Sequence, residues 1–225
     1  MSDNEEQKEE SKSSERPYIV LLDKAVLETV KTKRGTFELL NCDDHRNLAG
    51  KIKKDPATLR PDILHQELLA LLDSPLNKAG KLKVYINTTK NVLIDVNPAI
   101  RIPRTFKRFA GLMVQLLHKL KIRSTNGSDT LLRVIKAPYT RHLPADCHTY
   151  VFSVTGTLYN PNQFAGQLPA GKPCCFVIGA MASGHIREED HPQTVEKVSL
   201  SEYPLSGATA INRLMGALET QHGIF

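Results

Sequence analysis

The chain has 225 residues, of which 40% are hydrophobic and 24% are charged, proportions typical of a globular protein that buries a sizeable core. No apolar run approaches the ~20 residues that a transmembrane helix needs, and the polar, acidic first residues are not those of a secretory signal. The four cysteines (Cys42, Cys147, Cys174 and Cys175) show neither a CxxC pair nor a Cys/His zinc spacing, which indicates reduced, buried thiols and no metal site.

The formal net charge of +6 is unevenly distributed along the chain. Residues 1–16 hold six acids and three bases, and their lack of periodicity predicts a disordered acidic tail. Between Ser74 and Ser128, eleven Lys or Arg residues stand against a single acid, Asp95. A solvated basic surface is one interpretation, and a polyanionic partner such as nucleic acid is the other.

The N-terminal third begins with two predicted strands. "YIVLLDKAVLETV" (residues 18–30) opens with a short apolar run that predicts a buried strand leading into a helix or loop. "TFELLNCDDH" predicts a second strand that ends in turn-forming residues. Asp43, Asp44 and His45 could ligate a metal, but no second cluster supports this, and a turn or helix cap is the favoured interpretation.

A helix followed by a hairpin comes next. Pro61 suits the first turn of a helix, and the residues after it that fall at helical spacing are Ile63, Leu64, Glu67, Leu68, Leu71 and Leu72. Asp73, Ser74 and Pro75 end this helix. "LKVYI" and "NVLIDV" then predict two strands around a turn at residues 87–91.

"RIPRTFKRF" (residues 101–109) predicts the start of a second helix, at Pro103. Apolar residues step by three and four from Ile102 to Leu120, which predicts an amphipathic helix of roughly five turns. Arg101, Arg104 and Arg108 share this stepping, so we expect them in one stripe at the N-terminal end of the helix.

This placement of arginines is unfavourable for the helix itself. Cations near a helix N-terminus oppose the macrodipole, typically by ~0.3–1 kcal/mol each, whereas the free N–H groups there favour an anion. Guanidinium groups bind phosphate oxygens in a bidentate manner. Ion pairs with acids elsewhere in the fold are the alternative, but the surrounding sequence has few acids, so phosphate binding is favoured.

The C-terminal third has the pattern of a parallel sheet. "TYVFSVTG" and "PCCFVIGAMASG" are apolar, β-branched runs that end in glycine. "EKVSLSEYPLSGATAINRLMGALE" predicts a strand, a loop and a helix that starts near Ser206 or Gly207 and buries Ile211, Leu214, Met215 and Leu218. This layout is typical of a nucleotide-type pocket at the carboxyl ends of strands. Since neither GxxxxGK[ST] nor GxGxxG occurs, we expect backbone groups of several loops to hold a ligand there.

Five motifs in a fixed order carry a resemblance to a known family. They are "LLNCDDH", "RPDILHQELLALLDSPLNKAGKLKVYI", "NPAIRIPRTFKRFAGLMVQLLHKL", "FVIGAMASG" and "VSLSEYPLSGATA". Together they resemble the eukaryotic ribosome-biogenesis methyltransferases that methylate N1 of a pseudouridine in small-subunit rRNA. This family belongs to the SPOUT class of trefoil-knotted, S-adenosylmethionine-dependent enzymes.

The resemblance implies a fold, an oligomeric state and a cofactor site. The fold would be α/β, with a mainly parallel sheet, helices on both faces and a C-terminal trefoil knot, an exception to the rule that chains avoid knots. One domain would span residues 17–225, with the knot at about 174–225 and RNA-binding elements at about 60–123. The enzymes are homodimers. Carried onto this chain, the residues that contact S-adenosylmethionine are Phe152, Gly179, Gly184, Val198, Ser199, Leu200, Ser201, Glu202 and Tyr203.

The resemblance also implies an RNA site at Arg60, Arg101, Arg104 and Arg108, with Asp62 placed to orient Arg60. The nucleophile would be N1 of pseudouridine, which carries an N–H because it is not the glycosidic atom of this base. The base would be flipped out of its stack to reach the cofactor. Asp62 could act as the base, but pairing with Arg60 favours a structural role. Stabilisation of the developing anion by arginine is the favoured mechanism.

Two other classes of function stay open. An RNA-binding assembly factor, acting as a scaffold with secondary or no catalysis, would share the arginines and lack only an intact cofactor pocket. A generic nucleotide-binding protein is disfavoured by the missing phosphate loops. A role in building the small ribosomal subunit would place the protein in the nucleus and nucleolus, with pre-ribosomal proteins as further partners and no membrane.

Overall fold

The computed structural model describes residues 17–33, 35–125 and 127–225, so the predicted tail at residues 1–16 lies outside the described residues. The strands are β1 Tyr18–Ala25, β2 Thr29–Lys31, β3 Phe37–Leu39, β4 Leu82–Thr88, β5 Leu93–Val96, β6 Lys121–Arg123, β7 Thr130–Ile135, β8 His148–Leu158, β9 Cys174–Gly179 and β10 Thr194–Ser199. The α-helices are α2 Arg46–Lys51, α3 Pro61–Asp73, α4 Pro75–Lys78, α5 Phe106–Lys119, α6 Pro161–Gln167 and α7 Gly207–His222. Three 3-10 helices complete the chain: η1 Pro56–Thr58, η2 Tyr139–His142 and η3 Glu188–Asp190.

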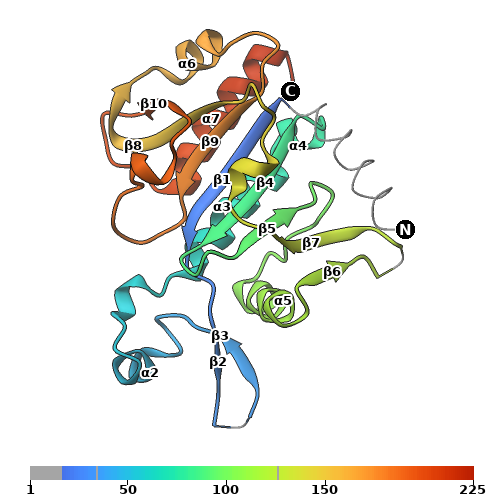
Figure 1. Cartoon of the computed structure of the whole chain (residues 1–225), viewed down its shortest axis with the longest axis vertical. Coiled ribbons are helices and arrows are strands. Elements are labelled where there is room, and N and C mark those ends of the chain that lie inside the picture. Colours follow the sequence, from blue (N-terminus) through green and yellow to red (C-terminus); the bar gives the residue numbers. More distant parts are fainter. Residues whose placement is uncertain (1–16, 34, 126) are drawn as a thin grey trace.

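An eight-stranded sheet in the order β10-β8-β9-β1-β4-β5-β7-β6 forms the centre of the fold (Figure 1). The pairings from β10 to β4 are parallel, and those from β4 to β6 are antiparallel. The prediction of a mixed α/β fold with a mainly parallel sheet is therefore confirmed. The predicted hairpin is confirmed as the antiparallel pair β4–β5.

A small lobe lies beside this sheet, at the bottom of Figure 1. It contains the antiparallel pair β2–β3, the helix α2 and η1. Its own apolar cluster consists of Val26, Leu40, Ala49 and Leu59. The chain therefore leaves the main sheet after β1 and returns to it only through α3.

The two faces of the main sheet are covered differently. Alternate residues of the strands point to opposite sides, and the larger core joins one side to α3, α4, α5, α6 and α7. The opposite side carries Ile19, Leu21, Tyr85 and Val177, and it packs against Tyr139 of η2 and nearby loop residues. The prediction of helices on both faces is therefore corrected for the described part of the chain: the longer α-helices share one face, and a 3-10 helix and loops pack on the other.

The predicted helices α3 and α7 are confirmed, because Pro61 opens α3 and Ser206 caps α7 with its hydroxyl, which accepts from the Thr209 N–H. The predicted start of the second helix at Pro103 is wrong. The structure begins α5 at Phe106, after Thr105 in an extended conformation. The reason is a tertiary contact: His65 Nε2 donates to the Pro103 carbonyl at 2.7 Å, which fixes the preceding segment as coil against α3.

This correction changes the arginine stripe as well. Arg108 lies on α5, whereas Arg101 and Arg104 lie in the coil before it. The three side chains therefore do not form one row on a helix. They belong to neighbouring parts of the α3–α5 pair, which His65 joins both through Pro103 and by stacking on Phe109 with ring centroids 4.4 Å apart.

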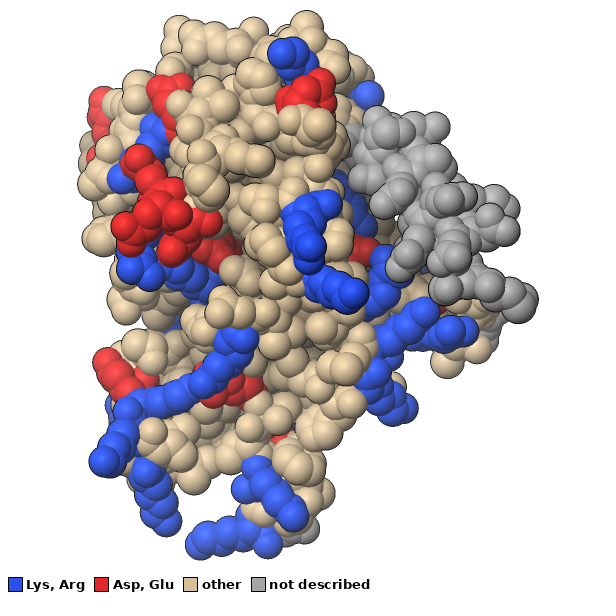
Figure 2. All heavy atoms as spheres, in the orientation of Figure 1, with Lys and Arg blue, Asp and Glu red and all other residues tan. Residues whose placement is uncertain are grey.

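Charge is unevenly distributed on the face that Figure 2 shows. Lys and Arg side chains spread over its lower half, around the small lobe and the α5–β6 region, whereas Asp and Glu gather beside β8 and β10. Among the described residues, no helix combines the length and the apolar character that crossing a membrane requires. Of the four free thiols, Cys174 and Cys175 are buried and the other two are half-buried.

Candidate functional site

A cavity of about 450 Å³ opens where β9 and β10 end and α7 begins. Its walls come from β8, from the loops after β9 and β10, and from the N-terminal turns of α3 and α7. This is the position at which open α/β sheets bind ligands, because loops diverge from the carboxyl ends of the strands. The structure therefore places this cavity where the glycine-ended strands predicted one.

Eight of the nine residues predicted to contact the cofactor line this one cavity. They are Phe152, Gly179, Gly184, Val198, Ser199, Leu200, Ser201 and Tyr203. Glu202 is the exception, since it is exposed and is absent from the wall. The sequence reasoning thus located the cavity, although the role of each residue stays a prediction.

The cavity combines apolar walls with hydroxyl groups. Ile178, Val198 and Leu200 supply apolar surface, and Ser153, Ser201 and Ser206 supply hydroxyls. A ligand with a flat ring and a polar sugar fits such a lining. The phenyl ring of Phe152 is committed to the core, because it packs edge-on against Phe164 and Phe176 with ring centroids 6.0 and 5.9 Å apart.

Two wall segments were missed by the sequence reasoning. One is the start of α7, where Ser206, Gly207 and Ala208 line the cavity; the helix start was predicted, but its link to the cavity was not. The other is α3, which contributes Ile63 and Gln66. Their proximity depends on how α3 packs on α7, for which a single sequence carries no signal.

Arg60 lies at the rim of the cavity and is held by Asp62. Arg60 is the residue before α3, and its Nε and Nη2 donate to Asp62 Oδ1 and Oδ2 at 2.8 and 2.7 Å. This is the bidentate geometry of an arginine–carboxylate pair. The predicted pairing is confirmed, and it occupies both oxygens of Asp62.

The other three predicted RNA-binding arginines are exposed. Arg104 pairs with Asp73, the last residue of α3, at 2.5 Å, although its side chain keeps 75% of its exposure. The alternative interpretation of an ion pair elsewhere in the fold therefore holds for Arg104. Surface pairs of this kind contribute little, about 0–1 kcal/mol, so a phosphate can displace Asp73.

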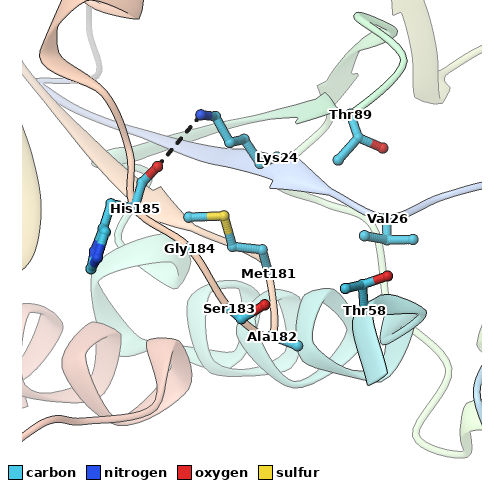
Figure 3. Close-up of a pocket in the computed structure, with 9 residues that line it drawn as sticks. All are labelled: Lys24, Val26, Thr58, Thr89, Met181, Ala182, Ser183, Gly184 and His185. Carbon is cyan, nitrogen blue, oxygen red and sulfur yellow. Dashed lines mark hydrogen bonds between the residues drawn. The ribbon is translucent and has the colours of Figure 1, made fainter. Parts of the chain in front are cut away.

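A second, smaller cavity of about 280 Å³ shares a wall with the first (Figure 3). Residues Met181–His185 line both cavities. The other residues of the smaller cavity are Lys24, Val26, Thr58 and Thr89. In Figure 3 the Lys24 side chain crosses above Met181 and points to the carbonyl of His185.

The Asp43, Asp44 and His45 cluster forms a turn and a helix start. The Asn41 side-chain oxygen accepts from the N–H groups of Asp43 and Asp44 at 3.0 and 2.9 Å, and His45 precedes α2. No group of three metal-binding side chains occurs within residues 17–33, 35–125 and 127–225. The turn interpretation is therefore confirmed.

Comparisons with known proteins show the family to which the chain belongs. The family described as EMG1/NEP1 methyltransferase matches residues 20–219. The ribosomal RNA small subunit methyltransferase mra1 of Schizosaccharomyces pombe is 50% identical over 92% of this chain, which spans 58% of that protein's length. The ribosomal RNA small subunit methyltransferase NEP1 of Homo sapiens is 49% identical, over 93% of this chain and 83% of that protein.

A solved structure supports the fold. The crystal structure of Archaeoglobus fulgidus Nep1 bound to S-adenosylhomocysteine superposes with a TM-score of 0.77, at 24% identity, over 92% of this chain and all of that one. At that identity the likeness concerns the fold. Together with the family match over nearly the whole described chain, these findings show that the chain belongs to the EMG1/NEP1 methyltransferase family.

Proposed function

We propose that this protein transfers a methyl group from S-adenosylmethionine to small-subunit rRNA, at N1 of a pseudouridine. The observation that carries the proposal is the convergence, on one cavity, of eight predicted cofactor contacts and Arg60. Membership of a methyltransferase family and relatives named for small-subunit rRNA methylation support the reaction and the substrate class.

The cavity fits the proposed cofactor in size and chemistry. Its volume of about 450 Å³ lies within the range of roughly 300–1,000 Å³ that small-molecule sites occupy. The apolar walls suit an adenine ring, and the serine hydroxyls suit ribose. The α7 N-terminus, with its outward N–H groups, suits a carboxylate.

The protein contributes to the reaction by positioning the reactants and by stabilising the charge that develops. S-adenosylmethionine supplies a methyl group already activated by its sulfonium. The substrate N1 would lose its proton to water before it takes up the methyl group, so negative charge would develop on the base, and S-adenosylhomocysteine would be the leaving group. Arg60, fixed at the cavity rim by Asp62, is placed to stabilise that charge. Uridine has no N–H at its glycosidic nitrogen, which makes the unmodified base a non-substrate.

Asp62 serves as a positioning residue in this proposal, because both of its oxygens accept from Arg60. We predict that Asp62→Asn lowers kcat by less than about tenfold and raises KM for the RNA. Loss of a general base would instead cost about 10²- to 10⁴-fold in rate. Steady-state methylation kinetics separate the two roles, and a kcat loss above a hundredfold with unchanged KM would assign Asp62 as the base.

The RNA interface that we propose consists of Arg60, Arg101, Arg104 and Arg108. Guanidinium groups at these positions would bind backbone phosphates around the flipped nucleotide. The excess of Lys and Arg between Ser74 and Ser128 and the basic region around α5 in Figure 2 support this.

Several properties follow from the family resemblance and belong to the same proposal. The chain would be one domain over residues 17–225, with a C-terminal knot at about 174–225, and it would act as a homodimer. It would take part in the biogenesis of the small ribosomal subunit in the nucleolus, where pre-ribosomal proteins are further partners.

Methyl transfer from labelled S-adenosylmethionine to two stem-loop RNAs tests the proposed function. The RNAs are identical except for uridine or pseudouridine at the target position. We expect transfer to the pseudouridine RNA alone. If neither RNA were methylated although both still bound, the protein would be an RNA-binding scaffold and not an enzyme. If both RNAs were methylated, N1 of pseudouridine would not be the methylated atom.

A further inference from the structure

The loop between β9 and β10, residues 180–193, contains the segment Met181–His185 that lines both cavities. The end of β1 contacts this loop at several points. The Ala180 N–H donates to the Asp23 carbonyl at 2.8 Å, and Lys24 Nζ donates to the His185 carbonyl at 3.5 Å (Figure 3). Further along, Lys24 Nζ lies 3.2 Å from Asp190 Oδ2. Two adjacent residues of β1 therefore hold the start, the middle and the end of this loop.

Asp23 also anchors the end of this loop through a buried chain of hydrogen bonds. Asp23 and His191 are each 2% exposed, and His191 Nε2 lies 3.2 Å from Asp23 Oδ2. The Tyr139 hydroxyl lies 2.9 Å from His191 Nδ1, and Asn87 Nδ2 donates to the other Asp23 oxygen at 2.8 Å. Since the carboxylate can only accept, His191 Nε2 carries a hydrogen and donates it to Asp23. Burial raises the pKa of Tyr139, which keeps its hydroxyl a donor.

The shallower contact is made by Lys24, and its backbone is unusual. Lys24 has φ +57°, in the left-handed region that side-chain-bearing residues rarely adopt. Glycine would occupy this position without strain. The strain persists where the surrounding structure over-determines the residue, and here the lysine ammonium bridges His185 and Asp190. The hydrogen bond from Lys24 also lowers the pKa of Asp190.

We propose that Lys24 is a positioning residue that holds the 180–193 loop in its ligand-ready conformation through Asp190 and His185. The inference rests on the proposed function, since the ligand is S-adenosylmethionine or its product. A loop ordered in advance costs less to bind than one that a ligand has to order itself. The Asp23–His191 contact anchors the same end of the loop in the core, so Lys24 sets the geometry of the exposed part.

The variant Lys24→Gly separates positioning from stability. Glycine relieves the left-handed strain, so we expect an unfolding midpoint no lower than that of the wild type. Loss of the ammonium frees the loop, so we expect S-adenosylhomocysteine to bind about 3- to 10-fold more weakly in isothermal titration calorimetry. Affinity for the stem-loop RNA without cofactor is expected to stay within about twofold.

Asp190→Asn and Arg187→Gln form the matched pair of controls. Asp190→Asn removes the partner of Lys24 and should weaken S-adenosylhomocysteine binding to the same degree. Arg187 also contacts Asp190, at 3.4 Å, but both residues belong to the loop. Arg187→Gln therefore removes an ion pair of Asp190 without detaching the loop from β1, and its affinity should match the wild type. The double variant Lys24→Gly/Asp190→Asn should lose no more than the larger single loss.

Each result decides one question. Wild-type affinity of Lys24→Gly or of Asp190→Asn would overturn the positioning role, as would an equal loss in Arg187→Gln or additive losses in the double variant. Weaker RNA binding with unchanged S-adenosylhomocysteine affinity would make Lys24 a phosphate contact and overturn the proposal. If the wild type itself did not bind S-adenosylhomocysteine, the proposed function would fail, and this inference with it.

Discussion

Glu67 is a carboxyl group inside the hydrophobic core. It shares the inner stripe of α3 with Leu64, Leu68 and Leu71, it is fully buried, and neither of its oxygens has a hydrogen-bond partner among the described residues. Burial raises the pKa of Glu67 from 4.5 to about 9. The side chain is therefore a neutral acid at physiological pH, and its proton is linked to folding.

The pH dependence of stability follows with a definite sign. The folded protein keeps the Glu67 proton up to about pH 9, whereas the unfolded chain releases it above pH 4.5. The contribution of Glu67 to the free energy of unfolding is therefore fully present at low pH and is lost as the pH rises from about 4.5 to about 9. At pH 8 we predict that Glu67→Gln is more stable than the wild type by about 1–4 kcal/mol, since each pKa unit is worth about 1.4 kcal/mol. Urea unfolding at pH 4.5 and pH 8 measures this.

The exposed Glu202→Gln is the control, and it should change stability equally little at both pH values. Parallel pH curves for Glu67→Gln and wild type would contradict the raised pKa.

Gly207 makes room for this carboxyl. A Cβ at Gly207 would lie 1.9 Å from Glu67 Oε1 and 2.9 Å from its Cδ. We predict that Gly207→Ala destabilises the protein by about 1–3 kcal/mol through overpacking. In a Glu67→Ser background the same change should be neutral or stabilising, because alanine is the better helix former. Urea unfolding of the four proteins gives the coupling energy, and a coupling near zero would show that the two residues do not compete for space.

At the scale of elements, β8 is the strand that deviates most from regular pairing. Its register with β10 jumps from Lys197↔Val151 to Val198↔Thr157, so the residues between bulge out of the ladder. Phe152, Ser153 and Val154 line the larger cavity from this bulge. The irregularity thus brings three residues of a strand to the site.

Gly156 allows the bulge to close on β10. A Cβ there would lie 2.6 Å from both the N and the C atoms of Val198, and backbone cannot move aside as a side chain can. We predict that Gly156→Ala destabilises the protein by more than about 2 kcal/mol. Gly216→Ala, in α7 with no atom near its Cβ, should instead stabilise by up to about 1 kcal/mol. Thermal unfolding compares them, and equal midpoints would refute the close approach.

The sequence predicted elements wherever periodicity and end signals coincide. Pro61 with its apolar stripe located α3, Ser206 located α7, and glycine-ended apolar runs located the parallel strands that frame the cavity. The helix start predicted at Pro103 was wrong, because a hydrogen bond from His65, 38 residues earlier, outweighs the local helix signal of the proline. The chain from Tyr139 through His191 to Asp23 spans up to 168 residues, a distance at which local patterns carry no information.

At the scale of the whole molecule, the face in Figure 2 carries an acidic region beside β8 and β10 and a basic region around α5 and the small lobe. A polyanion approaching this face would be attracted to the basic region and repelled by the acidic region, and the two effects together would orient it. Two of the proposed RNA-binding arginines have carboxylate partners: Arg60 pairs with Asp62, and the more exposed Arg104 pairs with Asp73.

We therefore predict that Asp73→Asn strengthens binding of the stem-loop RNA by about two- to fivefold at low salt. In the variant, Arg104 can bind an RNA phosphate without first giving up its ion pair with the Asp73 carboxylate. Fluorescence anisotropy over a salt series measures the effect, which should vanish at high salt. In an Arg104→Gln background the same Asp73 change should have no effect. A gain that persisted in that background would show that Asp73 repels the RNA directly.

The wall that the two cavities share has a thermodynamic consequence. Residues Met181–His185 face both hollows, so any occupant that reduces the motion of this segment alters the free energy of filling the other side. Such coupling is reciprocal by necessity: the factor by which the first ligand changes the affinity of the second equals the factor in the opposite order. One shared partition thereby makes the filling of the two cavities a single linked equilibrium.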